Sequence, residues 1–309
     1  MDFKHRTVLI SETIANLNIN PDGVYVDCTA GGGGLSYEIA SRLSSNGKLI
    51  CIDQDPDAIS VCEQRLKSFK NVIIVHGNFS NISYILHDLD IDFVDGIVLD
   101  IGVSSYQLDS SDRGFSYKYD AVLDMRMSKS GLSAYDVVNN LDYIELKNII
   151  RTYGEEEFAS RIAGLIIKKR NKKPIETTCE LAEIVSESIP CYARRRIGHP
   201  ARKTFQAIRI YVNNELDNLK KCLDQSINLL NKHGRIIVIT FHSLEDRIVK
   251  EKMLSWVNPC TCPSDFPTCI CCNKPKAKLF KKKPIVASEQ ELLVNHRSRS
   301  AKMRVCIKV

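Results

Sequence analysis

The chain has 309 residues, enough for about two domains of ordinary size and for a core that needs no disulfide or metal support. Apolar residues make up 44% and charged residues 26%, with 10 prolines, which excludes collagen-like and broadly disordered classes. Lysine plus arginine exceeds aspartate plus glutamate by 43 to 37, so an acidic partner is indicated only where basic residues cluster. Because no window approaches the roughly 18 apolar residues of a membrane helix, we expect a cytoplasmic protein with no membrane partner.

The first third of the chain alternates short apolar runs with helical patterns. Four strands are predicted within 23–30, 48–55, 71–80 and 93–102. A helix is predicted to begin after Asp55, an N-cap residue followed by proline. Continuous apolar runs separated by helices are typical of parallel strands that are buried on both faces, so we predict an α/β, doubly wound, mostly parallel sheet.

The last third adds two strands, which we predict at 234–242 and 303–309, after one long helical pattern at 206–231. Roughly 130 residues separate the fourth strand from the fifth, far more than a crossover helix requires. Most of them have helical periodicity. We therefore predict a discontinuous domain formed by residues 1–110 and 201–309, interrupted by an inserted helical domain of residues 111–200.

Basic residues are dense in and beside this insertion. They form either a phosphate-binding face or a solvated helix rim, two interpretations that the sequence supports equally. The residues are Lys168, Lys169, Arg170, Lys172, Lys173, Arg194, Arg195, Arg196, Arg202 and Lys203.

Four consecutive glycines, Gly31 to Gly34, follow the first predicted strand. Glycine at such a turn lets a ligand approach the backbone closely. The run lacks the third glycine of the dinucleotide fingerprint G-x-G-x-x-G, which disfavours a nicotinamide oxidoreductase. It resembles instead the D-x-G-x-G-x-G loop of class I S-adenosylmethionine methyltransferases, beginning at Asp27 and with Thr29 in the first glycine position. A tight connection between a strand and a helix is the simpler alternative.

Polar or aromatic residues come at the ends of the next three predicted strands. They are Asp53, Phe79 and Asp100. Ligands bind outside the carboxyl ends of parallel strands, where a carboxylate such as Asp53 can accept both ribose hydroxyls and an aromatic ring such as Phe79 can face adenine. Alternatively, the two aspartates cap the helices that follow, and Phe79 is a core residue. Their joint occurrence favours an adenosyl site.

Longer motifs make a family recognisable from about residue 5 to residue 250. They are Tyr25–Gly34 (YVDCTAGGGG), Asp100–Asp109 (DIGVSSYQLD), Arg113–Ser116 (RGFS), Leu123–Met127 (LDMRM), Tyr153–Glu156 (YGEE), His199–Ala201 (HPA), Thr204–Ile210 (TFQAIRI) and Phe241–Lys250 (FHSLEDRIVK). The chain resembles the ribosomal RNA small subunit methyltransferase H (MraW) family, the bacterial 16S rRNA cytidine N4-methyltransferases.

This resemblance implies a Rossmann-like class I methyltransferase fold with an inserted all-helical domain that recognises the substrate. It implies S-adenosyl-L-methionine as donor and a cytidine in the decoding centre of 16S ribosomal RNA as acceptor. The partner is then 16S rRNA or the small ribosomal subunit. Whether the chain also forms a homodimer is left open. Leu35 stands where the family usually has histidine, which leaves the main chain there for a contact. The residues implied in donor binding are Gly33, Gly34, Leu35, Asp53, Phe79, Asp100 and Gln107.

Methyl transfer from a sulfonium is an in-line displacement that depends mainly on positioning. The exocyclic amine of cytosine is a poor nucleophile, and acceptors for its hydrogens favour the charge-gaining transition state. We expect Asp100 to be that acceptor, with Ser104 or Ser105 assisting orientation; that Asp100 contacts the donor alone is equally supported. The base must be unpaired or extruded. Candidate stacking platforms are Phe115, Tyr117, Tyr119 and Phe205.

Two other functions are alternatives to an rRNA methyltransferase. One is a non-catalytic RNA-binding or ribosome assembly factor on the same fold, which loss of donor binding would indicate. The other is an amine methyltransferase that acts on another substrate.

Five cysteines gather between residues 260 and 272. They are Cys260, Cys262, Cys269, Cys271 and Cys272. The number of thiols suffices for a tetrahedral zinc site or an iron–sulfur cluster, although zinc ligands usually pair as C-x₂-C or wider and the pairs here are C-x-C. Reduced cysteines in a proline-rich loop are the alternative, and the sequence leaves the metal open. The basic tract at 274–283 that follows predicts a further contact or a charged hairpin.

Overall fold

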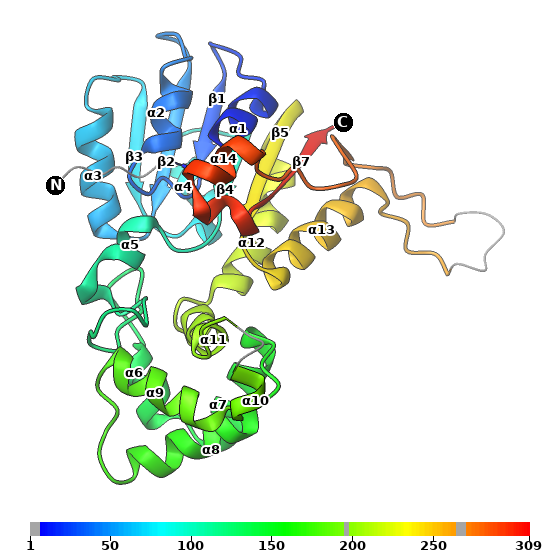
Figure 1. Cartoon of the computed structure of the whole chain (residues 1–309). Coiled ribbons are helices and arrows are strands. Elements are labelled where there is room, and N and C mark those ends of the chain that lie inside the picture. The colour runs from blue at the N-terminus through cyan, green and yellow to red at the C-terminus, as the bar shows by residue number, and fades with distance from the viewer. Residues whose placement is uncertain (1–6, 195–197, 264–269) are drawn as a thin grey trace. The chain divides into compact units, whose positions relative to one another are not determined.

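The computed structural model describes residues 7–194, 198–263 and 270–309 (Figure 1). The chain divides into two compact units, unit 1 (residues 1–102 and 216–309) and unit 2 (residues 103–215). The borders of unit 2 lie outside the predicted insertion of 111–200, because α11 (Arg202–Val212) packs against α7 (Tyr143–Gly154) within unit 2. The assignment of donor and substrate domains stays a prediction.

Unit 1 contains a seven-stranded sheet in the order β3-β2-β1-β4-β5-β7-β6. The first five of these strands are parallel, whereas β7 is antiparallel to β5 and β6 is antiparallel to β7. The strands are β1 Val24–Asp27, β2 Lys48–Asp53, β3 Val72–His76, β4 Val94–Asp100, β5 Leu230–Thr240, β6 Ala277–Leu279 and β7 Lys302–Lys308. The predicted doubly wound, mostly parallel sheet is confirmed, and its strand order reverses between β1 and β4.

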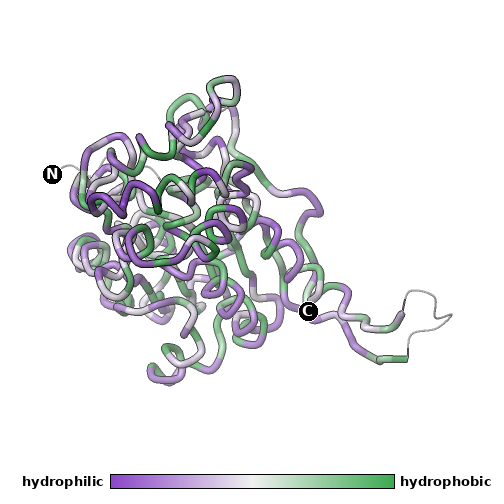
Figure 2. Tube along the Cα trace, turned by 90° about the horizontal axis from the view of Figure 1, so that it is seen from below, coloured by the Kyte–Doolittle hydropathy of each residue, from purple (hydrophilic) through white to green (hydrophobic). Residues whose placement is uncertain are grey.

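Helices cover both faces of this sheet, and each face has its own core. On one face α1, α2 and α3 pack against the strands, and on the other α4, α12 and α13 do so. The helices are α1 Ile10–Leu17, α2 Gly34–Ala40, α3 Pro56–Leu66, η1 Phe79–Asn81, α4 Ile82–Asp88, α12 Glu215–Leu229, α13 Ser243–Val257, α14 Glu289–Val294 and η3 His296–Ser300. Hydrophobic and hydrophilic residues alternate along them in Figure 2, as expected of helices with one buried face.

The start of α3 follows from its sequence. Asp55 accepts a hydrogen bond from the Asp57 backbone N–H at 3.1 Å, and Pro56 is the first helical residue. A missing backbone donor costs nothing at that position, so Asp55 and Pro56 together set the helix boundary. The predicted N-cap is confirmed.

Unit 2 is helical, apart from one isolated bridge between Val122 and Thr177 among its described residues. Capping boxes at Ser133, Asp142 and Thr177 begin three of the helices. Its core includes Ile162 and Ile166, two residues of the insertion that are four positions apart in the chain. The remaining elements are α5 Ser105–Asp109, η2 Ser111–Arg113, α6 Ala134–Asn140, α8 Ala159–Arg170, α9 Thr178–Ser188 and α10 Cys191–Arg194.

The single helix predicted at 206–231 was wrong, because α11 ends at Val212 and α12 begins at Glu215. Between them, Asn214 has a left-handed φ of 49°. The side chain of Asn213 accepts a hydrogen bond from the Met127 backbone N–H and donates one to the Met125 carbonyl, both at 2.8 Å. These bonds to a distant segment outweigh the helical preference of the surrounding residues.

Among the described residues, no helix combines the length and apolar character needed to span a bilayer.

Candidate functional site

The candidate site lies in unit 1, at the carboxyl ends of the strands where the strand order reverses. Asp27, Asp53 and Asp100 are the last residues of β1, β2 and β4, three strands that are neighbours in the sheet. The edge outside such a reversal is where ligands bind in open α/β sheets. The structure therefore brings together three of the strand ends that the sequence singled out.

Asp27 organises the glycine loop from within. Its side chain is completely buried, and it accepts hydrogen bonds from the Ser36 hydroxyl at 2.6 Å and from the Thr29 backbone N–H at 3.2 Å. Burial raises the pKa of this carboxyl. Gly31 and Gly33 have φ values of 51° and 72°, a region that side chains with a Cβ rarely adopt. The loop thus bends on its glycines and leaves main chain uncovered.

Two further hydrogen bonds tie this loop to the neighbouring strand ends. The Gly31 backbone N–H donates to the Asp53 carboxylate at 2.8 Å. On the other side, the Asp100 backbone N–H donates to the Thr29 hydroxyl at 2.7 Å. Glycine in place of Thr29 would lack this acceptor, so the departure from the usual loop pattern has a structural reason.

Asp100 has an oxygen without a hydrogen-bond partner. Its Oδ1 atom is buried and unpaired in the described part of the chain. Burial first, and then the neighbouring charges of Asp27 and Glu245, raise the pKa of Asp100 to about 8. Unsatisfied buried acceptors are rare in folded proteins, so this atom points to a ligand that supplies a donor or a positive charge.

The Asp53 carboxyl has a milder perturbation. Burial first, and then the charges of Asp55 and Asp27, raise its pKa to about 6, although hydrogen bonds from the Asp55 and Gly31 backbones oppose the shift. Asp53 is not the cap of the next helix, because Asp55 is the N-cap of α3. The Asp53 Oδ1 accepts a hydrogen bond from the Asp55 backbone N–H at 2.9 Å. Each carboxylate oxygen still has a lone pair for another donor.

Glu245 is a buried acid that the sequence analysis missed. It has 0% exposure and accepts hydrogen bonds from the backbone N–H groups of Phe241 (2.8 Å) and His242 (3.2 Å). Its Oε1 lies 3.0 Å from the His242 Nε2, and the two residues form a capping box that begins α13. The glutamate three residues after the N-cap was the signal available in the sequence, but the cap is a histidine rather than the usual serine or threonine.

Phe79 lies at the start of η1, directly after β3, and is half-buried against the core of unit 1. The preceding residue, Asn78, caps that turn and donates a hydrogen bond to the Gln54 side chain at 2.7 Å. Gln54 follows Asp53, so the ends of β2 and β3 are joined. The predicted core contact of Phe79 is therefore present, and its contact with adenine stays a prediction.

Leu35 is a core residue, 4% exposed, and packs on the α1–α3 face of the sheet. Its main chain alone is therefore available for the predicted contact. Ser104 and Gln107 belong to unit 2, where they form the reciprocal cap that begins α5; the Gln107 side chain accepts from the Ser104 backbone N–H at 3.0 Å. The Ser105 side chain lies outside what the structure describes.

Within unit 2, several of the basic residues are paired. Lys169 lies 2.8 Å from Glu187, and Lys173 lies 3.2 Å from Glu180. The Lys203 ammonium donates to the Glu155 carbonyl at 2.8 Å. Arg195 and Arg196 fall outside the described residues. The helix-rim interpretation therefore holds for part of the cluster.

The aromatic candidates in unit 2 divide into two groups. Phe115 and Phe205 are 6% and 3% exposed and belong to the core. Tyr119 is exposed, and Tyr117 stacks on His199 with ring centroids 4.1 Å apart. Tyr117 and His199 also line an open hollow of about 520 Å³ together with Arg194. The exposed or stacked rings are the ones that fit a base-stacking role.

Comparison with known proteins places these observations in context. The profile described as MraW methylase family matches residues 2–309. A relative from Clostridium botulinum (strain Kyoto / Type A2) named ribosomal RNA small subunit methyltransferase H is 58% identical over 310 residues, which cover 100% of both chains. A relative of the same name from Lachnospira eligens is 55% identical over 307 residues, 99% of this chain and 98% of its own. Among solved structures, an rRNA methylase from Streptococcus thermophilus covers 100% of this chain and 99% of its own at 9% identity and a TM-score of 0.44.

Proposed function

The chain belongs to the MraW methylase family, and on that premise we propose that it transfers a methyl group to the N4 amine of a cytidine in 16S ribosomal RNA. It is an S-adenosylmethionine-dependent methyltransferase, and ribosomal RNA is its substrate. Full-length identity of 55–58% to proteins named ribosomal RNA small subunit methyltransferase H is the observation that carries the proposal. The N4 position and the cytidine are the more specific part of the proposal, beyond methylation of ribosomal RNA.

The residues at the strand reversal fit the donor. S-adenosylmethionine supplies, when bound, an electrophilic methyl group on a positively charged sulfur. The acidic side chains at this edge complement a positive charge, and the unpaired Asp100 Oδ1 offers it a contact. Asp53 accepts the ribose hydroxyls, and Phe79 borders the adenine. The loop residues Gly33, Gly34 and the main chain of Leu35 line the donor.

Asp100 has two roles in this proposal. The first is donor binding; the second is to accept a hydrogen of the cytosine amine. The amine nitrogen would become positively charged on taking the methyl group. Asp100 in its ionised form would stabilise that charge at the amine hydrogen, and the proton would then leave for the carboxylate or for water. Ser104 and Ser105 assist orientation of the base.

The RNA partner must present an unpaired or extruded base. We assign RNA contacts in unit 2 to Tyr117, Tyr119 and Arg194. Tyr119 is exposed, Tyr117 stacks on His199, and Arg194 is a cation that lines the same hollow as Tyr117. Free 16S rRNA and the assembled small subunit are the two forms in which the substrate can be presented.

Sedimentation of the purified chain tests two partners in one series. The chain alone shows whether it forms a homodimer, and the chain mixed with small subunits shows whether it binds them.

The decisive experiment is methyl transfer from labelled S-adenosylmethionine to small subunits from cells that lack the modification. We expect label in N4-methylcytidine at a single position after nucleoside mapping. Label in a different nucleoside would overturn the N4 assignment. Donor binding without any transfer to subunits or to free rRNA would favour the assembly factor, and transfer to another amine would favour the second methyltransferase alternative.

Variants of Asp100 separate its two roles. Asp100→Asn should lower kcat by about 10²-fold or more, the usual effect of losing a positioned proton acceptor. Asp88→Asn is the matched control, because that carboxylate is 82% exposed. Near-normal transfer by Asp100→Asn with donor affinity retained would remove the catalytic role.

A further inference from the structure

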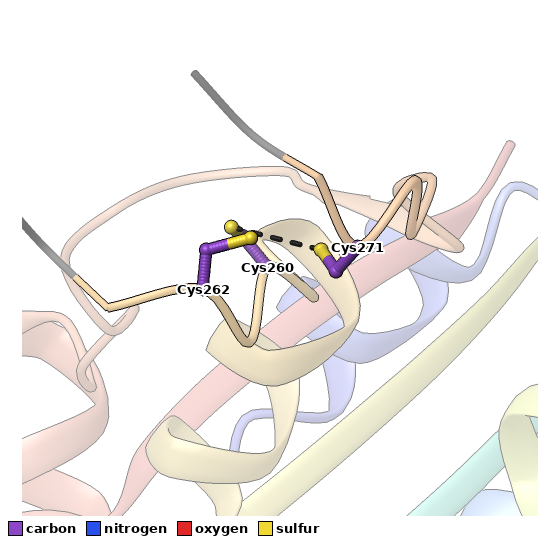
Figure 3. Close-up of side chains that lie close together, drawn as sticks. All are labelled: Cys260, Cys262 and Cys271. Carbon is purple, nitrogen blue, oxygen red and sulfur yellow. Dashed lines mark hydrogen bonds between the residues drawn. The ribbon is translucent and has the colours of Figure 1, made fainter. Parts of the chain in front are cut away.

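Three cysteines meet in the loop between α13 and β6. Cys260 and Cys262 lie on the outgoing arm, after α13, and Cys271 lies on the arm that returns to β6. Figure 3 shows their side chains turned toward one another. Their sulfur atoms all lie within 4.8 Å of one another, and the sulfurs of Cys260 and Cys271 are 3.8 Å apart.

These distances match a shared metal ion better than a disulfide. Sulfur atoms joined in a disulfide are about 2.05 Å apart. Two thiolates on one tetrahedral Zn²⁺, each at about 2.3 Å, are separated by about 3.8 Å. The measured Cys260–Cys271 separation of 3.8 Å equals that tetrahedral edge. The C-x-C spacing is no obstacle, because it places Cys260 and Cys262 on the same side of the arm, facing Cys271.

A backbone donor already faces one of the sulfurs. The Ile270 N–H donates to the Cys262 sulfur at 3.3 Å. Hydrogen bonds of this kind orient metal ligands in known sites. The cluster thus has both the ligand atoms and a hydrogen bond that orients one of them.

Hydrogen bonds that do not involve sulfur also join the described parts of the two arms, from the Asn273 amide to the Pro259 carbonyl at 3.1 Å and from the Lys276 N–H to the Trp256 carbonyl at 2.8 Å. Ile270, an apolar residue of the returning arm, is 69% exposed. Short segments without a core of their own are commonly stabilised by a structural metal.

We propose that Cys260, Cys262 and Cys271 bind one structural Zn²⁺ that joins the two arms of this loop. Zinc is the metal of choice because three thiolates in a tetrahedral arrangement suit it, whereas an iron–sulfur cluster is ordinarily held by four cysteines. The fourth position is taken by water or by another thiol of the loop. Cys269 lies outside the described residues and has no part in the argument.

The test is metal content by mass spectrometry on protein purified without chelator. We expect one zinc per chain in the wild type and a loss of at least 80% in Cys260→Ser and in Cys271→Ser. Cys191→Ser, which removes an exposed cysteine of unit 2, is the matched control and should keep the full zinc content. Fluorescence of Trp256 and binding of S-adenosylmethionine should be unchanged in all three variants, which shows that zinc is not lost through unfolding.

A second measurement uses the thiols directly. In the native wild type, a thiol reagent should titrate three fewer cysteines than it does after a zinc chelator is added. Reconstitution with Co²⁺ should produce the visible absorption bands of a tetrahedral thiolate site, and Cys271→Ser should lack them. Wild-type protein without zinc, equal zinc in Cys271→Ser and Cys191→Ser, or a disulfide between Cys260 and Cys271 in freshly purified protein would each overturn the proposal. None of these results depends on methyl transfer.

Discussion

The protonation of Asp100 makes the stability of unit 1 depend on pH. Its pKa is about 8 in the folded chain, against 3.8 as the ordinary value. The folded state therefore holds a proton that the unfolded chain releases, and stability falls as the pH rises between these two values and levels off above about 8. Each pH unit in this window costs about 1.4 kcal/mol, and less close to pH 8, where half of the Asp100 side chains are already ionised; a rise from pH 6 to pH 8 therefore removes about 2 kcal/mol.

Asp100→Asn isolates this contribution because asparagine keeps the shape of the side chain and does not titrate. The difference in unfolding free energy between variant and wild type should grow by about 2 kcal/mol in favour of the variant from pH 6 to pH 8. Asp27 and Asp53 are present in both proteins, so their own raised pKa values largely cancel in the difference. The donor is left out of the assay.

Urea denaturation followed by fluorescence is the measurement. Trp256 is the single tryptophan of the chain and is 4% exposed in the core of unit 1, so its signal reports on the unit that contains Asp100. Asp88→Asn should follow the wild-type pH dependence. If Asp100→Asn also follows it to within about 0.5 kcal/mol, Asp100 is ionised in the folded protein and the reasoning from its burial is refuted.

Three further predictions follow from the glycine loop and its neighbours. Thr29→Val leaves the Asp100 backbone N–H without its acceptor and should cost about 1–3 kcal/mol in the same denaturation assay, whereas Thr29→Ser should cost far less; equal losses would contradict the hydrogen-bond argument. Gly33→Ala should cost about 1–2 kcal/mol, because φ is 72° and the new Cβ would lie 3.3 Å from the Cys62 sulfur; an unchanged urea midpoint would count against it. Calorimetry should show tighter binding of S-adenosylmethionine as the pH rises through about 8, since ionised Asp100 attracts the sulfonium, and a weaker trend for the uncharged thioether product; parallel trends would speak against contact with Asp100.

Much of unit 1 could be predicted from local sequence. Strands buried on both faces appear as apolar runs, and each predicted run contains an observed strand or overlaps one closely. The break between α11 and α12 could not be predicted in this way. Its cause is a pair of hydrogen bonds between the Asn213 side chain and the main chain of residues 125 and 127, about 86–88 positions away in the chain. Local periodicity contains no information about such partners.

The candidate site likewise has features that could be predicted from the sequence and features that could not. From the rule that ligands bind at strand carboxyl ends, the sequence predicted that Asp53 and Asp100 share one edge of the sheet, and the structure has them there at the ends of β2 and β4, with β1 between these strands. The hydrogen bond between Thr29 and the Asp100 backbone spans 71 residues and could not be read from the sequence. Glu245 was overlooked for a different reason: its cap residue is a histidine, whose ring accepts the backbone N–H that a hydroxyl usually accepts.

The position of β5 after unit 2 in the chain has a consequence for synthesis on the ribosome. When β4 has emerged, its free edge must wait for its parallel partner until unit 2, α12 and then β5 have been translated, up to residue 240. At about 5–20 residues per second, this interval is on the order of 10 s. During that time a row of unpaired backbone groups on an apolar strand is open to other chains. Nascent chains released before residue 240 should therefore aggregate, and chaperone capture should peak over this interval.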